Sequence, residues 1–363
     1  MNNEKRVFIT DCEGPISKND NAFEIASHFI PEGQRLFTQI SRYDDVLADV
    51  VKREGHEAGD TLRLIAPFLK AYGVTNKDLE RFSARTLLLM PGAKETLRYL
   101  QRKMPSFIVS TSYEHYVRTL CRTLNFPYEN CYCTSMNLDT AQMNKEEQER
   151  LTQFRREICS APLIEIPEGA SSAQEMSARD RQLVERLDAI FREEVAAMES
   201  GAILKETKPV GGREKARAAE DIVKRTESSL NNVIYFGDSI TDVECFRLVR
   251  AKNGVTVSVN GNIYAVREAE IAVLATNVLV VAAITDIFEK HGKEGVHSLI
   301  DRWGEESLEK YDINPGLRKQ LQTTFPKTLP RICKVTSHNL KPLAQASSSL
   351  RKFLRGEKVG GLG

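Results

Sequence analysis

Two carboxylates follow directly after the first apolar run of the chain. The run Val7–Ile9 leads through Thr10 to Asp11, and Glu13 comes two places later in the motif DCEG. In parallel α/β sheets the functional site lies beyond the carboxyl ends of the strands. We therefore expect Asp11 and Glu13 to lie at such a site.

Two later apolar runs end in a similar way. Phe107–Val109 is followed by Ser110, and Val233–Phe236 is followed by GDSITD, which contains Asp238 and Asp242. Each signal alone also fits an ordinary helix N-cap, because Asp and Ser are common there. Their repetition after three strand-like runs favours convergence of these side chains on one site.

Clustered carboxylates repel one another, and their burial is costly unless a cation shares the site. Oxygen ligands without nearby His or Cys are typical of Mg²⁺. A bound phosphate would also need a basic partner, and two lysines of KETKPVGGREK qualify. Lys215 opens a helical pattern, where the helix N-terminus favours an anion, and Lys208 precedes it. The alternative for either lysine is a solvated surface position.

Strand-like runs alternate with helical patterns along the chain, which is typical of a parallel sheet covered by helices. We predict a Rossmann-like three-layer α/β core with a helical cap after the first strand, a second mostly helical insertion and a helical C-terminal extension. No strand is expected past Ile287. The predicted divisions are 1–17, 91–136 and 208–290 for the core, 18–90 for the cap, 137–207 for the insertion, and 291–363 for the basic extension.

The composition is that of an ordinary soluble globular protein. The 363 residues are 41% hydrophobic and carry a formal net charge of +1, so we expect no general attraction to nucleic acid. No apolar run is long enough to predict a membrane span, and no apolar leader begins the sequence. Seven scattered cysteines indicate reduced thiols, and hence a cytoplasmic location, rather than a disulfide framework.

The charge is nevertheless uneven. Residues 316–363 hold ten Lys and Arg but only one acid, Glu357. Within this tail, NLKPLAQASSSLRKFLRG has apolar residues near helical spacing. This helix could dock on a protein partner or an anionic surface, or pack on the chain's own core, and we favour own-core packing. The insertion 137–207 is a second candidate for a protein contact.

The chemical motifs together resemble those of the haloacid dehalogenase superfamily. The resemblance rests on Asp11-Cys-Glu13-Gly14, on Ser110 after a strand, on a lysine that opens a helix, and on GDSITD. The helical stretch containing SKNDNAFEIASHF is similar to the cap of the phosphoserine phosphatase branch. The chain also looks similar to an archaeal group labelled as subunit R of energy-converting hydrogenase.

The resemblance implies a phosphatase that forms an aspartyl-phosphate. Asp11 would be the nucleophile and Glu13 the general acid and base. Ser110 and Lys215 would hold phosphoryl oxygens, and the family spacing favours Lys215 over Lys208.

The resemblance also implies a Mg²⁺ site and a substrate pocket. Asp11, the backbone carbonyl of Glu13 and Asp238 would bind the metal, and Asp242 would complete the metal site by orienting Lys215 or a metal-bound water. The expected substrate contacts are Asp20 and Arg63 of the cap, with Thr111 and Ser112 after the second strand.

The chain departs from the family pattern at three places. Glu13 replaces the common Asp, Pro15 replaces Thr or Val, and Ser110-Thr111-Ser112 stands where phosphoserine phosphatases have Ser-Gly-Gly. Lost glycines put the phosphoserine pocket in doubt, because glycine allows close backbone approach to a ligand. The leading hypothesis is a phosphatase of a small soluble phosphorylated metabolite. The alternatives are a phosphotransferase using the same residues, and a non-catalytic subunit or binding protein.

Overall fold

A single mostly parallel sheet lies at the centre of the protein. The computed structural model describes residues 5–167, 169–304, 308 and 310–361, and within these ranges the sheet has seven strands in the order β3-β2-β1-β4-β5-β6-β7. Neighbouring strands are parallel except for β6 and β7. The strands are β1 (Val7–Thr10), β2 (Ser106–Tyr113), β3 (Cys131–Thr134), β4 (Val233–Gly237), β5 (Val255–Val259), β6 (Ile271–Leu274) and β7 (Arg331–Lys334).

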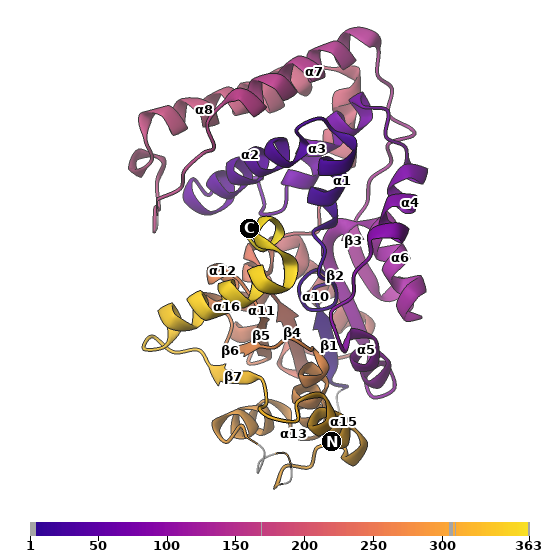
Figure 1. Cartoon of the computed structure of the whole chain (residues 1–363), viewed down its shortest axis with the longest axis vertical. Coiled ribbons are helices and arrows are strands. Elements are labelled where there is room, and N and C mark those ends of the chain that lie inside the picture. Colours follow the sequence, from indigo (N-terminus) through magenta and orange to yellow (C-terminus); the bar gives the residue numbers. More distant parts are fainter. Residues whose placement is uncertain (1–4, 168, 305–307, 309, 362–363) are drawn as a thin grey trace.

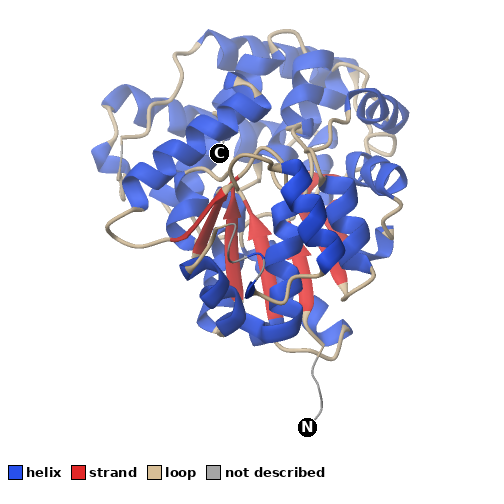
Figure 2. Cartoon of the chain, turned by 60° about the horizontal axis from the view of Figure 1, so that its bottom comes forward, coloured by secondary structure: helices blue, strands red, loops and turns tan. Residues whose placement is uncertain are grey.

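Helices cover both faces of the sheet (Figure 2). Successive strand residues point to opposite faces, so Phe8 of β1 packs with α5, α6 and α13, whereas Val7 and Ile9 pack with α10 and α11. The predicted three-layer α/β core is thereby confirmed. The core helices are α5 (Ala93–Gln101), α6 (Glu114–Leu124), α10 (Arg213–Arg225), α11 (Val243–Ala251), α12 (Ile263–Glu268), α13 (Leu279–Asp301) and α15 (Pro315–Thr324).

The two long helical stretches form one layer beyond the sheet, which we call the insertion layer (Figure 1). Their side chains share one hydrophobic core. For example, Phe68 of α3 meets Phe191 with ring centroids 6.2 Å apart, and Phe154 of α7 is buried in the same core. The layer comprises α1 (Asn21–Phe29), α2 (Gly33–Asp45), α3 (Thr61–Ala71), α4 (Asn76–Thr86), α7 (Lys145–Ser160), α8 (Ala178–Asp188) and α9 (Ala202–Glu206), with π-helical turns at Val46–Val50 and Ala189–Val195.

Local sequence signals fix several of these helix starts. Asp20 caps α1 by accepting a hydrogen bond from the backbone N–H of Phe23, and Asn144 caps α7 in the same way. Thr75 and Asp78 form a reciprocal capping box at the start of α4. None of the helices in the described ranges combines the length and the apolar character needed to cross a membrane.

The expectation that no strand follows Ile287 was wrong. Strand β7 pairs antiparallel to β6, with Ile332 opposite Val273 and Cys333 opposite Ala272. The sequence RICK gives little sign of a strand, because only its two central residues are apolar. Such a short strand with charged ends is typical of a sheet edge.

The tail forms the predicted helix and packs on the chain itself. Helix α16 (Leu340–Arg355) buries Leu343 and Ala344 against Val266 and Ala272, and a short helix α17 (Glu357–Gly360) follows it. In Figure 1 the yellow α16 lies between the sheet and the insertion layer. This position brings the end of α16 to the carboxyl edge of the sheet.

Candidate active site

The carboxyl ends of β1 and β4 meet at one edge of the sheet. Thr10 is in register with Phe236, and the backbone N–H of Asp11 donates to the carbonyl of Phe236 at 2.8 Å. This pairing places Asp11 and Asp238 on one cavity, which Ser110 of the neighbouring strand β2 also lines. The structure therefore brings together the strand-end residues found in the sequence.

The turn after β1 passes very close to Asp238. Gly14 has φ +94°, and a Cβ at this position would lie 2.1 Å from Oδ2 of Asp238. Both the backbone conformation and the contact therefore require glycine here.

Lys215 is fully buried and joins two carboxylates. Its Nζ donates to Oδ2 of Asp11 at 2.7 Å and to Oδ1 of Asp242 at 2.8 Å, and the Tyr235 hydroxyl donates to the same Asp242 oxygen at 2.7 Å. Burial lowers the pKa of Lys215, but the two carboxylates outweigh burial, so its pKa is raised overall. Lys215 is therefore held as a cation beside Asp11.

Asp242 is engaged by protein donors at both oxygens. Besides Lys215 and Tyr235 at Oδ1, the backbone N–H groups of Asp238 and Ser239 donate to Oδ2 at 2.9 and 3.1 Å. Asp242 thus orients Lys215 and fixes the turn after β4. A metal ion at Asp242 would have to compete with these donors.

The acidic cluster fits a hard divalent cation. Carboxylate oxygens of Asp11, Asp238 and Asp242 lie within 4.8 Å of one another. Burial raises the pKa of Asp11 to about 7, although Lys215 works against this. Oδ1 of Asp238 accepts no hydrogen bond from any residue within the described ranges, so it is available as a ligand. Asp11 and Asp238 together offer hard oxygens, which Mg²⁺ prefers.

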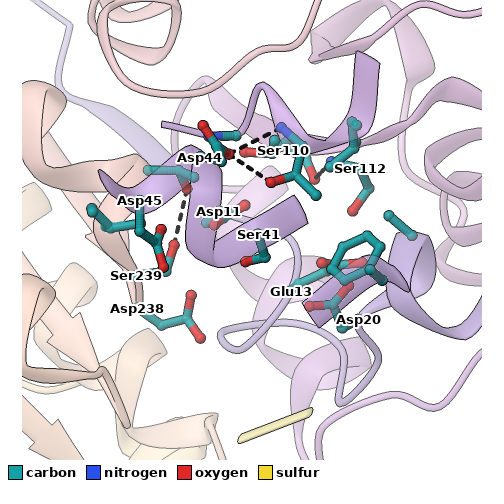
Figure 3. Close-up of a pocket in the computed structure, with 18 of the residues that line it drawn as sticks. Asp11, Glu13, Asp20, Ser41, Asp44, Asp45, Ser110, Ser112, Asp238 and Ser239 are labelled. Atoms are coloured by element: carbon teal, nitrogen blue, oxygen red, sulfur yellow. Dashed lines mark hydrogen bonds between the residues drawn. The ribbon is translucent and has the colours of Figure 1, made fainter. Parts of the chain in front are cut away.

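Glu13 and Asp20 line the same cavity and lie next to each other (Figure 3). Oε1 of Glu13 accepts a hydrogen bond from the backbone N–H of Asn21 at 2.8 Å. Burial raises the pKa of Glu13, and the neighbouring Asp20 raises it further. Asp20 is the helix cap of α1, so its carboxylate is already held by that helix.

Three consecutive residues within β2 make different contacts, because the strand does not end before Ser110 as expected but continues to Tyr113. Ser110 is fully buried, and its Oγ accepts from the backbone N–H of Ser112 at 3.1 Å. Thr111 donates to the carbonyl of Val210 at 3.0 Å, which ties β2 to the segment before α10. Oγ of Ser112 is buried without a partner among the described residues. Ser110 and Ser112 therefore keep hydrogen-bonding capacity beside the cavity.

Two candidate residues lie away from the cavity. Arg63 forms an ion pair with Asp60 on α3 and is not among the residues that line the cavity. Lys208 is exposed and follows the insertion, whereas Lys215 contacts Asp11 directly. Of these two lysines, Lys215 is the one that contacts the acidic cluster.

Two arginines that the sequence did not predict enter the site from α16. Nη1 of Arg351 donates to the backbone carbonyl of Asp238 at 3.1 Å and also bonds its Oδ2. Nη1 of Arg355 donates to the same Oδ2 at 3.0 Å. Burial lowers the pKa of Arg351, and attraction to Asp238 offsets part of that effect. The basic tail is therefore a component of the site.

The spacing along α16 contains a signal for this contact. Leu343, Ser347, Arg351 and Arg355 are four residues apart and so follow one helix face. The first three are buried. A helix face that changes from apolar to cationic indicates burial against an acidic group, but the sequence alone does not identify that group.

The cavity is small and opens into a larger cleft. Its volume is about 100 Å³, and Ser41, Asp45 and Ile240 line both the cavity and a cleft of about 1040 Å³ between the sheet and the insertion layer. Among the described lining residues of the cavity, six carboxyl groups face two guanidinium groups: Asp11, Glu13, Asp20, Asp44, Asp45 and Asp238 against Arg351 and Arg355. This excess of acids favours binding of a cation.

One solved structure is similar to this chain over almost its whole length. Gene product AF1437 from Archaeoglobus fulgidus is similar at 26% identity and a TM-score of 0.79, and the match covers 99% of each chain. The two chains therefore share their architecture, including the insertion layer and the C-terminal part.

Phosphoserine phosphatase structures are more distant. The apo form matches at 12% identity and a TM-score of 0.47, covering 77% of this chain and 98% of that one. A substrate-bound complex matches at 14% identity and a TM-score of 0.47, covering 77% and 97%. No family model matches the chain, and no curated protein matches it.

Proposed function

We propose that this protein is a metal-dependent phosphatase that hydrolyses a small phosphomonoester through a phosphorylated Asp11. The observation that carries the proposal is the buried Lys215, which bonds Asp11 at 2.7 Å and Asp242 at 2.8 Å beside Asp238. A carboxylate held next to a fixed cation at strand ends is suited to attack a phosphoryl group, because the cation offsets developing charge.

The chemistry assigned to the chain has two steps. A carboxylate oxygen of Asp11 attacks phosphorus, the bond to the ester oxygen breaks, and Glu13 gives its proton to the departing alkoxide. A water molecule then attacks the phosphorus of the acyl phosphate, Glu13 takes a proton from it, and Asp11 is regenerated as inorganic phosphate leaves. Ser110 and Lys215 would hold the phosphoryl oxygens that do not react.

The metal proposed for the site is Mg²⁺. Asp11, Asp238 and the backbone carbonyl of Glu13 would hold it, and Asp242 would act mainly through Lys215, because its oxygens already accept four hydrogen bonds. When bound, the ion would neutralise phosphoryl charge as a Lewis acid.

The proposed substrate is a small molecule. A cavity of about 100 Å³ supports a phosphoryl group with few further atoms, unless the insertion layer moves to admit more. As a cap, the insertion layer would exclude bulk water during reaction. The proposed location of the protein is the cytoplasm, in keeping with its free thiols.

A hydrolysis screen over phosphorylated metabolites tests the proposal. Purified protein with Mg²⁺ should release inorganic phosphate, EDTA should abolish the release, and added Mg²⁺ should restore it. Asp11→Asn should reduce turnover by several orders of magnitude while leaving the fold intact, because an amide does not form an acyl phosphate.

Two results would contradict the proposal. Full activity after exhaustive metal removal would exclude the metal-dependent mechanism, and an active Asp11→Asn variant would exclude Asp11 as nucleophile. Phosphate transfer to an added alcohol in preference to water would instead identify a phosphotransferase that uses the same residues.

A further inference from the structure

Two thiols meet where the last turn of α6 lies against the edge strand β3. Sγ of Cys121 lies 3.4 Å from Sγ of Cys131, and both cysteines are free. A disulfide has an S–S distance of about 2.0 Å, so the two sulfur atoms would have to approach one another by only about 1.4 Å. The folded protein therefore holds this pair close to a bonding distance.

Strand register and helix packing together produce the contact. Alternate residues of a strand point to the same face, so Cys131 and Cys133 both pack on the hydrophobic cluster that contains Cys121, whereas Tyr132 packs on the other face. Cys131 is in register with Ile108 of β2, and Cys121 lies in the last turn of α6. Both sulfur atoms are thus positioned by regular elements rather than by a loop.

Cys121 lies in the wall of a surface pocket. The pocket has a volume of about 380 Å³, and its other walls are Arg118 and Arg122 of α6 and the turn 125–128. Cys121 is 3% exposed and Cys131 is half-buried. An oxidant must therefore be small to reach the pair, and hydrogen peroxide is little larger than water.

The two thiols are suited to different steps of an oxidation. The contact with Cys121 and burial raise the pKa of the Cys131 thiol, which disfavours the thiolate form that attacks an oxidant. Cys121 lines the pocket, whereas Cys131 is not among its lining residues. We therefore assign the first oxidation to Cys121 and the second step to Cys131.

We propose that Cys121 and Cys131 form a reversible disulfide when the protein meets a peroxide. The sulfur of Cys121 attacks one peroxide oxygen, the O–O bond breaks, and one water leaves, so that Cys121 becomes a sulfenic acid. The sulfur of Cys131 then attacks the sulfenic sulfur, the S–O bond breaks, and a second water leaves with the Cys131 proton. Two thiols are oxidised and one hydrogen peroxide is reduced to two waters. This inference is independent of the proposed function.

The disulfide would fasten β3 to α6. Oγ1 of Thr134, the last residue of β3, donates to the carbonyl of Thr111 and accepts from the backbone N–H of Val210 at 3.1 Å. The strand β3 thereby joins β2 to the segment that leads into α10. Closing the short ring between Cys121 and Cys131 removes conformations from the unfolded chain, so we expect the oxidised protein to be more stable than the reduced protein.

Peptide mapping of the full-length protein tests the proposal. Protein that has been reduced with dithiothreitol and then freed of it is treated with hydrogen peroxide, unfolded and alkylated. Two of the seven cysteines should escape alkylation, the map should join Cys121 to Cys131, and dithiothreitol should restore both thiols. The melting temperature of the oxidised protein should be higher by about 3–6 °C.

Cys133→Ser is the matched control for Cys131→Ser. Cys133 lies on the same face of β3, but its sulfur contacts the hydroxyl of Tyr128 at 3.5 Å. The disulfide should form in Cys133→Ser and should be absent in Cys131→Ser, and melting curves of the reduced variants check that both are folded. The map of the wild-type protein decides the question even if a variant does not fold.

Three results would overturn the proposal. The first is a wild-type map in which Cys121 is joined to Cys133 or to Cys12 instead of Cys131. The second is oxidation of Cys121 to a sulfinic or sulfonic acid without any link, because Cys131 would then not react with the sulfenic acid. The third is a lower melting temperature of the linked protein, because the fold would then not hold the pair in a geometry suited to the bond.

Discussion

Lys215 donates a hydrogen bond to Asp11 at 2.7 Å, although 204 residues separate the two along the chain. The contact joins the start of α10 to the end of β1, and it is fully buried on the lysine side. It holds the Asp11 carboxylate beside a fixed positive charge.

Lys215→Ala should reduce kcat/KM for nitrophenyl phosphate about 10²- to 10³-fold, because a fixed cation beside the reacting carboxylate is lost. It should also lower the free energy of unfolding by about 3–5 kcal/mol, since Asp11 and Asp242 would then be buried without their partner. Lys208→Ala is the control, because Lys208 is exposed and should leave both quantities nearly unchanged. A larger loss of activity in Lys208→Ala than in Lys215→Ala would show that Lys208, not Lys215, is the lysine that acts in the reaction.

Glu13→Gln should slow dephosphorylation more than phosphorylation. With nitrophenyl phosphate, whose leaving group needs little acid assistance, the phosphorylated Asp11 should accumulate in a single turnover. The overall rate should fall about 10²- to 10⁴-fold, as is typical when a general base is lost. Rapid-quench kinetics measure both steps. Wild-type turnover on both good and poor leaving groups would exclude Glu13 as acid and base.

Gly14→Ala should disturb Asp238 and so reduce activity. The added Cβ would lie 2.1 Å from Oδ2 of Asp238, and the residue would keep φ +94°. The matched control is Gly55→Ala, which has φ +73° and nothing within 4 Å of the added Cβ. Both variants should lose about 1–3 kcal/mol from backbone strain, but only Gly14→Ala should also lose activity and metal affinity. Urea unfolding and phosphate release distinguish these effects.

Leu343→Ala should destabilise the packing of α16 on the core and thereby lower turnover, although Leu343 itself does not line the cavity. Leu343 is fully buried, so its truncation should cost about 2–5 kcal/mol of packing. Protease cleavage within 340–355 should become faster, and turnover should fall because Arg351 and Arg355 leave Asp238. Phe353→Ala is the control, because Phe353 is 79% exposed. If turnover stayed at the wild-type level while α16 was cleaved, the site would not depend on this helix.

The core of the site could be predicted because its residues directly follow runs of buried apolar residues, even though β2 itself continues past Ser110. Asp11, Ser110 and Asp238 each come after a run of apolar residues, and parallel pairing brings strand ends together whatever the length of the intervening segments. Lys215 could be selected for a similar reason, since its place at a helix start limits where its side chain can reach.

Other features depend on contacts between distant segments, which a single sequence does not encode locally. In the sequence, nothing distinguishes Arg351 from the other basic residues of the tail. It reaches Asp238 because Leu343 packs against Val266 and Ala272. Likewise β7 gains its identity from pairing with β6 rather than from its own four residues. Arg63, proposed from the resemblance alone, lies outside the cavity because Asp60 holds it on α3.

The position of α16 also affects the order in which the protein matures during synthesis. Residues 340–355 are made after all the strands and after the whole insertion layer, yet two of their arginines complete the wall around Asp238. A chain that ends before Arg351 could already form the parallel strands and hold Asp11 against Lys215. It would nevertheless lack both arginines beside Asp238, so the site should be complete only after α16 has been made and has docked.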